Sequence, residues 1–174
     1  SSMSSTPAMD EAKLMAFIGK VVEDMGAAAS CALALIGVRL GLYRALADGP
    51  ATSSELAERT GTTERYVREW LLNQAAGGYI DYDASTQRYS MSKEHAFALS
   101  DDGPASVVGG FQIVAGLVAA QPRIREAFRT GEGMTWGEHA PDVFEGTERF
   151  FRTAYVRHLT GEWIPALEGV TARL

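Results

Sequence analysis

The sequence predicts a mainly α protein: a winged helix-turn-helix with a small β-hairpin, flanked by helices on both sides. Between Thr52 and Met91, two segments with apolar residues at helical spacing are separated by a short turn that contains Gly61. Two short alternating segments follow around a polar turn, as expected of a hairpin. Helix, turn, helix and hairpin in this order define the winged variant of the motif.

The first helix of the motif has clear start and stop signals. Thr52 and Glu55 have the spacing of a capping box, in which each side chain accepts a hydrogen bond from a backbone N–H that lacks a helical partner. Leu56 and Ala57 are expected to face the core. Gly61 ends the helix because glycine adopts the left-handed conformation at low cost.

The second helix is expected to begin at a cap supplied by Thr62 or Thr63 and to stop at Gly77-Gly78. Its core-facing stripe consists of residues three and four apart, namely Val67, Trp70, Leu71 and Gln74. Tyr79–Tyr82 and Arg88–Met91 are the predicted strands, joined by the polar turn 83–86.

The N-terminal segment from Asp10 to Ala47 is predicted to be helical, in two pieces with a break or bend at Gly26. The run from Ala27 to Val38 is apolar on almost every side, yet at about 12 residues it is shorter than the roughly 20 that a bilayer requires. A helix apolar all round is buried. We therefore expect a second copy to cover these helices, with burial by the chain itself as the alternative. The side chains that support a dimer are Leu14, Phe17, Val21, Leu33, Ile36 and Leu40.

The C-terminal segment is predicted to be helical as well. Ser92 is a cap for a short helix, and Pro104 suits the first turn of the next one. Val107–Ala120 is rich in small residues, so another element should pack closely against it. Pro122 is expected to start a separate helix. In a last helix, Thr147–Leu159, the side chains expected to face inward are those of Phe150, Phe151, Ala154 and Tyr155.

Charge and cysteine content limit the possible functions. The chain carries a formal charge of −6, and between residues 53 and 78 Arg59, Arg65 and Arg68 stand against four glutamates, a net charge of −1. A DNA-binding protein needs basic side chains to neutralise phosphates, so DNA binding is disfavoured. Cys31 is a lone cysteine, which excludes a disulfide framework and favours the cytoplasm.

Motifs for metal or nucleotide chemistry are not recognisable. The three histidines have no ligand spacing, and no glycine-rich turn follows a hydrophobic strand. The remaining candidates for an apolar substrate pocket are Trp136, Phe150, Tyr155 and Trp163, with His139 and His158 as weak catalytic candidates. The alternative is that the aromatic residues are core and the histidines are surface groups.

The chain resembles the N-terminal region of bacterial class I S-adenosylmethionine-dependent methyltransferases, of the type sometimes labelled transcriptional regulators in mycobacteria. The segments that carry the resemblance are Ile36–Leu46, Thr52–Ala57, Arg65–Leu71, Gly78–Ile80 and Glu162–Leu167. In that family the winged helix dimerises and covers a small-molecule substrate. The resemblance therefore implies a homodimer, and either histidine as a general base on an acceptor hydroxyl. The alternative function is a winged-helix DNA-binding transcriptional regulator.

The resemblance also implies a domain order. Residues 1–9 are expected to be a disordered tail with an expression remnant ahead of Met3, 10–48 dimerisation helices, 49–92 the winged helix-turn-helix, and 93–174 a substrate wall and linker. The cofactor domain would begin just past Leu174 and is absent from this chain. Alone, the chain is thus expected to bind neither S-adenosylmethionine nor metal and to be inactive, while the full-length protein would use S-adenosylmethionine.

Overall fold

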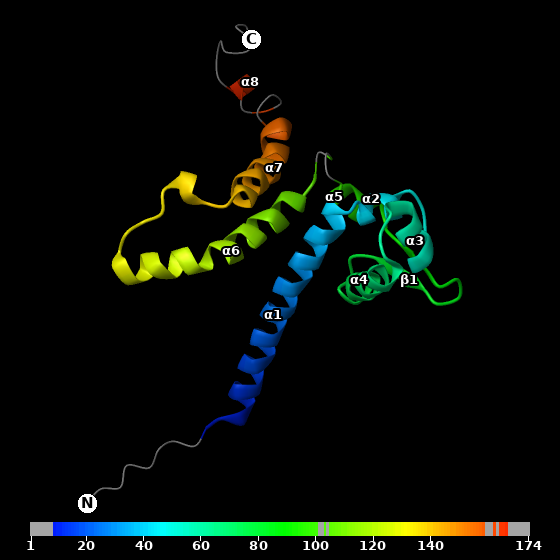
Figure 1. Cartoon of the computed structure of the whole chain (residues 1–174), viewed down its shortest axis with the longest axis horizontal. Coiled ribbons are helices and arrows are strands. Elements are labelled where there is room, and N and C mark those ends of the chain that lie inside the picture. The colour runs from blue at the N-terminus through cyan, green and yellow to red at the C-terminus, as the bar shows by residue number, and fades with distance from the viewer. Residues whose placement is uncertain (1–8, 101–102, 104, 159–161, 163, 167–174) are drawn as a thin grey trace, which may run out of the picture.

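The computed structural model describes residues 9–100, 103, 105–158, 162 and 164–166, and these are mainly helical (Figure 1). The elements in chain order are α1 (Glu11–Arg39), α2 (Leu42–Ala47), α3 (Ser53–Thr60), α4 (Glu64–Ala76), β1 (Asp81–Asp83), β2 (Arg88–Ser90), α5 (Lys93–Ala98), α6 (Val108–Thr130), the 3-10 turn η1 (Trp136–Glu138), α7 (Pro141–His158) and α8 (Ile164–Ala166). Helices α2 to α4 and the β1–β2 hairpin form the winged helix, so the predicted fold class is confirmed.

The capping box predicted at the start of α3 and the left-handed glycine predicted at its end are both confirmed. The Thr52 hydroxyl accepts a hydrogen bond from the Glu55 N–H (3.2 Å), and the Glu55 carboxylate accepts one from the Thr52 N–H (2.9 Å). Gly61 follows the helix with a φ of 63°, in the left-handed region. Leu56 and Ala57 are buried, because they lie on the face of α3 that packs against α4.

Helix α4 buries the predicted stripe of Val67, Trp70, Leu71 and Gln74 and ends before Gly77. Thr63 is its N-cap residue, but the Thr63 side chain makes no capping hydrogen bond. The start of α4 is fixed instead by Glu64, whose carboxylate accepts from the Ser53 hydroxyl of α3 (2.7 Å).

The hairpin is shorter than predicted, since each strand has three residues with Tyr82 opposite Tyr89. The Asp83 carboxylate holds the turn by accepting hydrogen bonds from the backbone and hydroxyl of Ser85 and from the Thr86 hydroxyl. A bridge between Ala51 and Tyr89 connects the wing to the segment before α3.

One core holds the winged helix and the end of α1 together. Its centre is Trp70, whose indole N–H donates to the Leu33 carbonyl of α1 (2.9 Å) and whose ring meets Tyr43 edge-on at 4.9 Å. Gly37 lies directly beneath this ring: a Cβ atom at Gly37 would lie 2.4 Å from Trp70 Cζ2. The core of the winged helix therefore includes α2 and the last turns of α1, as well as α3 and α4.

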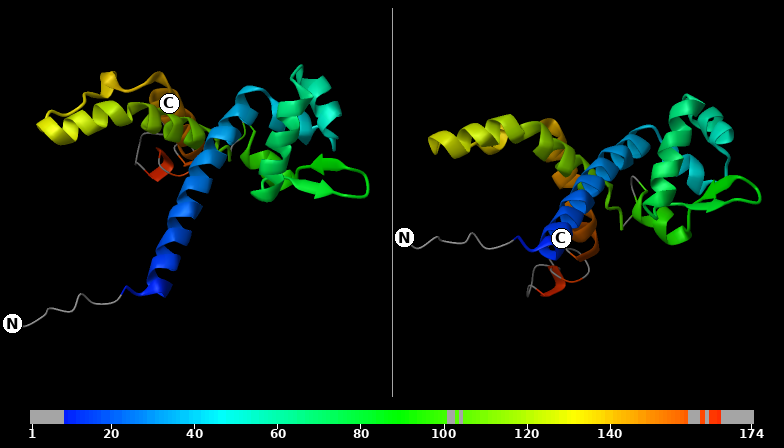
Figure 2. Two further views of the ribbon diagram at one scale, coloured as in Figure 1. Left: turned by 60° about the horizontal axis from the view of Figure 1, so that its bottom comes forward. Right: turned by 90° about the horizontal axis from the view of Figure 1, so that it is seen from below.

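The expected break at Gly26 is wrong, because α1 continues through it as one helix of 29 residues. A single helical glycine costs only about 1 kcal/mol, whereas a break would forfeit hydrogen bonds on both sides. The chain turns instead at Gly41, with a φ of 69°. The N-terminal half of α1 projects away from the rest of the chain (Figures 1 and 2).

Helices α6 and α7 form an antiparallel hairpin that packs beside α1 (Figure 2). As predicted, the small residues of α6 permit a close approach: Cβ atoms at Gly109 and Gly116 would lie 2.5 Å from the Gly146 carbonyl oxygen and 2.4 Å from Val143 Cγ2 of α7. The predicted new helix at Pro122 is wrong, since α6 runs through Pro122 to Thr130. Pro122 removes one backbone hydrogen bond from α6 without ending the helix.

The remaining C-terminal predictions have mixed outcomes. The Ser92 hydroxyl caps α5 by accepting from the His95 N–H, as predicted. Pro104 and the end of the predicted last helix at Leu159 lie outside the described residues.

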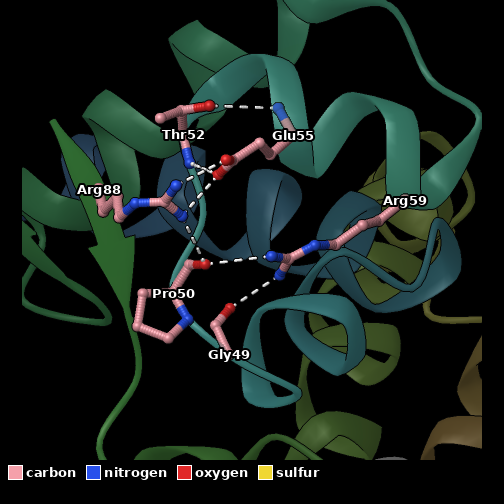
Figure 3. A network of polar contacts seen from close by, with 6 residues as sticks. All are labelled: Gly49, Pro50, Thr52, Glu55, Arg59 and Arg88. Atoms are coloured by element: carbon pink, nitrogen blue, oxygen red, sulfur yellow. Dashed lines mark hydrogen bonds and ion pairs between the residues drawn. The ribbon is translucent and has the colours of Figure 1, made fainter. Parts of the chain in front are cut away.

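Arg59 and Arg88 link the segment after α2, helix α3 and the wing through a network of hydrogen bonds (Figure 3). Arg88 of β2 donates two hydrogen bonds to the Glu55 carboxylate, at 2.6 and 2.7 Å, and a third to the Pro50 carbonyl. Arg59 donates to the carbonyls of Gly49 and Pro50. The Thr52 N–H and Arg88 lower the pKa of Glu55 below its ordinary value, so the carboxylate stays ionised.

The close contact at Gly37 predicts that Gly37→Ala is destabilising by about 1–3 kcal/mol, because the methyl group would force Trp70 or α1 to shift. Thermal unfolding followed by circular dichroism measures this. Gly19→Ala is the matched control on the same helix, where nothing lies within 4 Å. It should be neutral or slightly stabilising; equal effects of the two changes would contradict the packing.

The lowered pKa of Glu55 predicts a pH-dependent contribution to stability. Above the unfolded-state pKa of roughly 4.3, ionised Glu55 stabilises the fold, and this contribution is lost as the pH falls through the lower folded-state pKa. Glu55→Gln should therefore lower the unfolding midpoint at pH 7, and the difference from the parent should shrink below about pH 4. Thermal unfolding of the parent and of Glu55→Gln at pH 7 and at about pH 3 measures this, and an equal difference at both pH values would contradict the contribution of Glu55.

Candidate functional site

An apolar groove runs between the end of α1 and α4. It has a volume of about 540 Å³. The lining residues are Leu33, Ile36, Leu40, Leu42, Thr62, Thr63, Tyr66, Val67, Glu69 and Trp70. We call this the α1/α4 groove. Its floor is rigid, because Trp70 is fixed by its hydrogen bond to Leu33 and by its contact with Gly37, while Tyr66 stands on the rim with 78% of its surface exposed.

An exposed apolar stripe leads into the groove along α1. Its residues recur at spacings of three and four, which places them on one face of the helix. They are Ile18, Val22, Met25, Ala29, Ala32, Ile36 and Leu40. All of these side chains are exposed, and in the part of the chain that the structure describes no element covers the N-terminal half of α1. By contrast, Ala34, Leu35 and Val38 are buried by this chain alone.

The arginines of the winged helix are held in internal contacts. On α4, Arg65 pairs with Glu69 and Arg68 with Glu64, each four residues apart on one helix. The hydrogen bonds from Arg68 and Ser53 lower the pKa of Glu64, so its charge offsets that of Arg68. Arg59 and Arg88 donate to the backbone and to Glu55, as described above. This arrangement offers phosphates little unpaired positive charge.

The candidate His139 lies at the far tip of the α6–α7 hairpin, half-buried in a shallow cavity of about 440 Å³. The neighbours that line this cavity are Ile124, Ala127, Phe128, Gly131, Glu132, Gly133 and Met134. Phe128 is 88% exposed, so this tip is apolar and open. The backbone of Trp136 forms the adjacent turn η1.

The aromatic residues of α7 do not all face inward as expected. Phe150 lies against Gly110 of α6, within 3.4 Å of a Cβ atom built there, but Phe151 and Tyr155 are about half exposed. The reason is the close approach at Gly146, which sets the face of α7 that meets α6 and turns Phe151 and Tyr155 away. The side chain of Ala154 lies outside the described part of the structure.

His158 pairs with Glu162 at 3.0 Å, at the other end of α7 from His139. Helix α7, which is about 26 Å long, lies between the two histidines. Trp163 lies outside the described residues. His139 and His158 are thus separated by α7, and the role of the six candidates in a substrate site stays a prediction.

Sequence reasoning did not identify the α1/α4 groove. The sequence predicts Thr62 or Thr63 as a capping residue, whereas the structure places both of them, with the exposed Tyr66, on the lining of the groove. A signal was available, because the apolar spacing continues without interruption from Ile18 to Leu40.

The described elements can be compared with those that bind dinucleotide-type cofactors and metal ions. Their strands are β1 and β2, and a helix opening after a strand and a glycine-rich turn is not among the described elements. The described residues likewise contain no group of three metal-ligating side chains.

Helix α1 is longer than the 12-residue run considered in the sequence, and among the described helices it alone is long and apolar enough to cross a membrane. This is weak evidence, since core helices and signal sequences pass the same test.

Comparison with known structures gives the same architecture. The fold is similar to that of the mitomycin 7-O-methyltransferase MmcR, with a TM-score of 0.65, 24% identity and coverage of 85% of this chain and 47% of that protein. It is also similar to SAH-bound CalO1, a methyltransferase in calicheamicin biosynthesis, with a TM-score of 0.62, 22% identity and coverage of 87% and 48%. An O-methyltransferase family protein from Burkholderia thailandensis matches with a TM-score of 0.58, 14% identity and coverage of 93% and 47%.

The chain spans about half the length of these solved structures, and at such identities the likeness establishes the fold. No curated protein matches by sequence. A family model, described as the Rv2258c-like winged HTH domain, matches residues 28–101. The resemblance inferred from sequence motifs is thereby confirmed: residues 28–101 match the Rv2258c-like winged HTH domain, and the chain shares its fold with about half of each of these methyltransferases.

Proposed function

We propose that this chain is the N-terminal dimerisation and substrate-covering region of an S-adenosylmethionine-dependent methyltransferase that acts on a small molecule. Two kinds of support are available: the fold is shared with methyltransferases, of which one carries bound SAH, and this chain spans about half of each. The described residues hold no cofactor site, so the cofactor would bind to a further domain of the full-length protein.

The exposed apolar surface of α1 carries the dimerisation part of the proposal. Leu14, Phe17, Ile18, Val21, Val22 and Met25 all leave more than a third of their surface in water. Covering such surface is favourable by roughly 25 cal/mol per Å², and contiguous apolar surface of this size usually marks an interface. A second copy supplies equal apolar surface, as in symmetric homodimers.

The α6–α7 hairpin is the proposed substrate wall. Its apolar tip around Phe128 and its exposed Phe151 and Tyr155 offer the aromatic surface on which small-molecule sites are built. His139 and His158 lie at opposite ends of α7, so only one of them could reach a given acceptor hydroxyl as a general base.

A DNA-binding regulator is the alternative, favoured by the winged-helix fold itself. The charge of the chain and the internal contacts of Arg59, Arg65, Arg68 and Arg88 weigh against it. A location in the cytoplasm, away from membranes, is part of the proposal and is supported by the Lys20–Asp24 ion pair in the middle of α1.

The dimer predicts that the chain has twice its formula mass in solution, measured by light scattering. Ile18→Asp places a charge in the apolar face of α1 and should shift the mass towards a monomer, because an unpaired charge would be buried in the interface. Ile18 lies far from the core, so the variant should remain folded. Phe128→Asp at the hairpin tip is the control; a monomeric parent at high concentration would refute the dimer.

The alternative function predicts electrophoretic mobility shifts with duplex DNA that weaken steeply as salt is added. We expect none at sub-micromolar protein and low salt, because the arginines of the winged helix are paired or bonded to backbone. A saturable, salt-sensitive shift would replace the proposal with the regulator.

A further inference from the structure

We propose that the α1/α4 groove receives the N-terminal half of α1 from a second copy of this chain, so that α4 serves as a protein-docking helix. The inference rests on the proposed dimer and specifies which surfaces meet in it. In DNA-reading helix-turn-helix proteins the second helix of the motif enters the major groove. Here that helix is α4, and its residues Tyr66, Val67, Glu69 and Trp70 line the groove.

The groove and the apolar stripe are parts of one surface. Ile36 and Leu40 belong to both, so the stripe enters the groove at its C-terminal end. An interface that begins on the exposed half of α1 therefore continues into the groove without interruption. A dimer that covered the stripe and left the groove open would leave the apolar walls of the groove in water.

An antiparallel pair of α1 helices would cover the apolar stripe and fill the α1/α4 groove in the same dimer. If the two helices pair over their full length, the two-fold axis passes the middle of the helix at Met25. Residues 14–18 of one copy then lie opposite residues 32–36 of the other, which form one wall of the groove. The symmetry makes the contact reciprocal, with two grooves and two inserted segments per dimer.

The contact area suits a stable dimer. Seven large apolar side chains between Leu14 and Met25 are exposed. Each presents on the order of 100 Å², since burying such a side chain is favourable by roughly 1.5–3 kcal/mol at about 25 cal/mol per Å². With the groove walls and the reciprocal contact included, the total is on the order of 2,000 Å², the lower range of obligate homodimers.

The charges of α1 are compatible with this insertion. Lys13, Lys20 and Asp24 share one face of α1, and helical geometry places this face opposite Ile18 and Val22. Lys20 and Asp24 pair with each other at 2.8 Å. The groove itself contains one acidic side chain, Glu69, which is already paired with Arg65. Between residues 14 and 22 the inserted face therefore buries no charged side chain of α1.

A photo-crosslinking experiment tests the contact directly. p-Benzoylphenylalanine in place of Tyr66 should, on irradiation, give a covalent dimer whose linked peptide maps to residues 14–22 of the other copy. A link of this kind within one chain is excluded, because residue 18 lies about 22 Å along α1 from Leu33 in the groove wall. The matched control places the same probe at Leu72, which is also exposed on α4 but does not line the groove.

A second pair of variants measures the energetic contribution of the groove. Tyr66→Asp should weaken the dimer at least tenfold in dissociation constant, measured by sedimentation equilibrium, whereas Leu72→Asp should change it by less than about twofold. Tyr66 is a surface residue of the isolated chain, so its replacement should leave the circular dichroism spectrum unchanged.

Each result decides separately on the groove and on the dimer. A dimeric mass with no crosslink from position 66 to residues 14–22, or with unchanged affinity in Tyr66→Asp, would overturn the groove contact and leave the dimer standing. A monomeric parent would overturn both. Flotation of the parent with lipid vesicles, lost in Ile18→Asp, would assign α1 to a membrane and overturn both as well.

Discussion

The contact of Trp70 with Gly37 is the constraint on which the arrangement of this protein depends. A long helix and a winged helix can be joined at many angles, but the indole of Trp70 occupies the space that a side chain at position 37 would need. The hydrogen bond from Trp70 to the Leu33 carbonyl fixes the same contact along the helix axis. Because α1 is held here at its C-terminal end only, its other half remains free to meet another molecule.

This anchoring explains why one helix serves two purposes. Ala34, Leu35 and Val38 complete the core of the winged helix, while Ile36 lies on the opposite side of the same turn and is exposed. An all-round apolar helix thus need not be buried by one partner. Its faces can be divided: the chain's own core buries one face of the C-terminal part of α1, as the second alternative raised by the sequence requires, while cover of the exposed face by a second copy stays a prediction.

The sequence predicts local structure best where side chains bond to nearby backbone. The capping box at Thr52, the left-handed Gly61 and the cap at Ser92 depend on residues within a few positions, and all three are confirmed. Gly26 and Pro122 were read as boundaries by the same local rules, yet both lie inside helices whose continuity depends on distant or cumulative interactions. The α1/α4 groove joins residues more than twenty positions apart, so no local pattern could reveal its shape.

The glycine contacts between α6 and α7 have a mechanical consequence. Gly109, Gly116 and Gly146 bring the two backbones together near one end of the hairpin, and this contact can act as a fulcrum. From Gly116 to Thr130 the arm of α6 is about 21 Å long, so a rotation of about 10° at the fulcrum displaces the tip by roughly 4 Å. A small rotation of α6 at the glycine contacts would therefore become a larger displacement at the hairpin tip, where Phe128 and His139 lie.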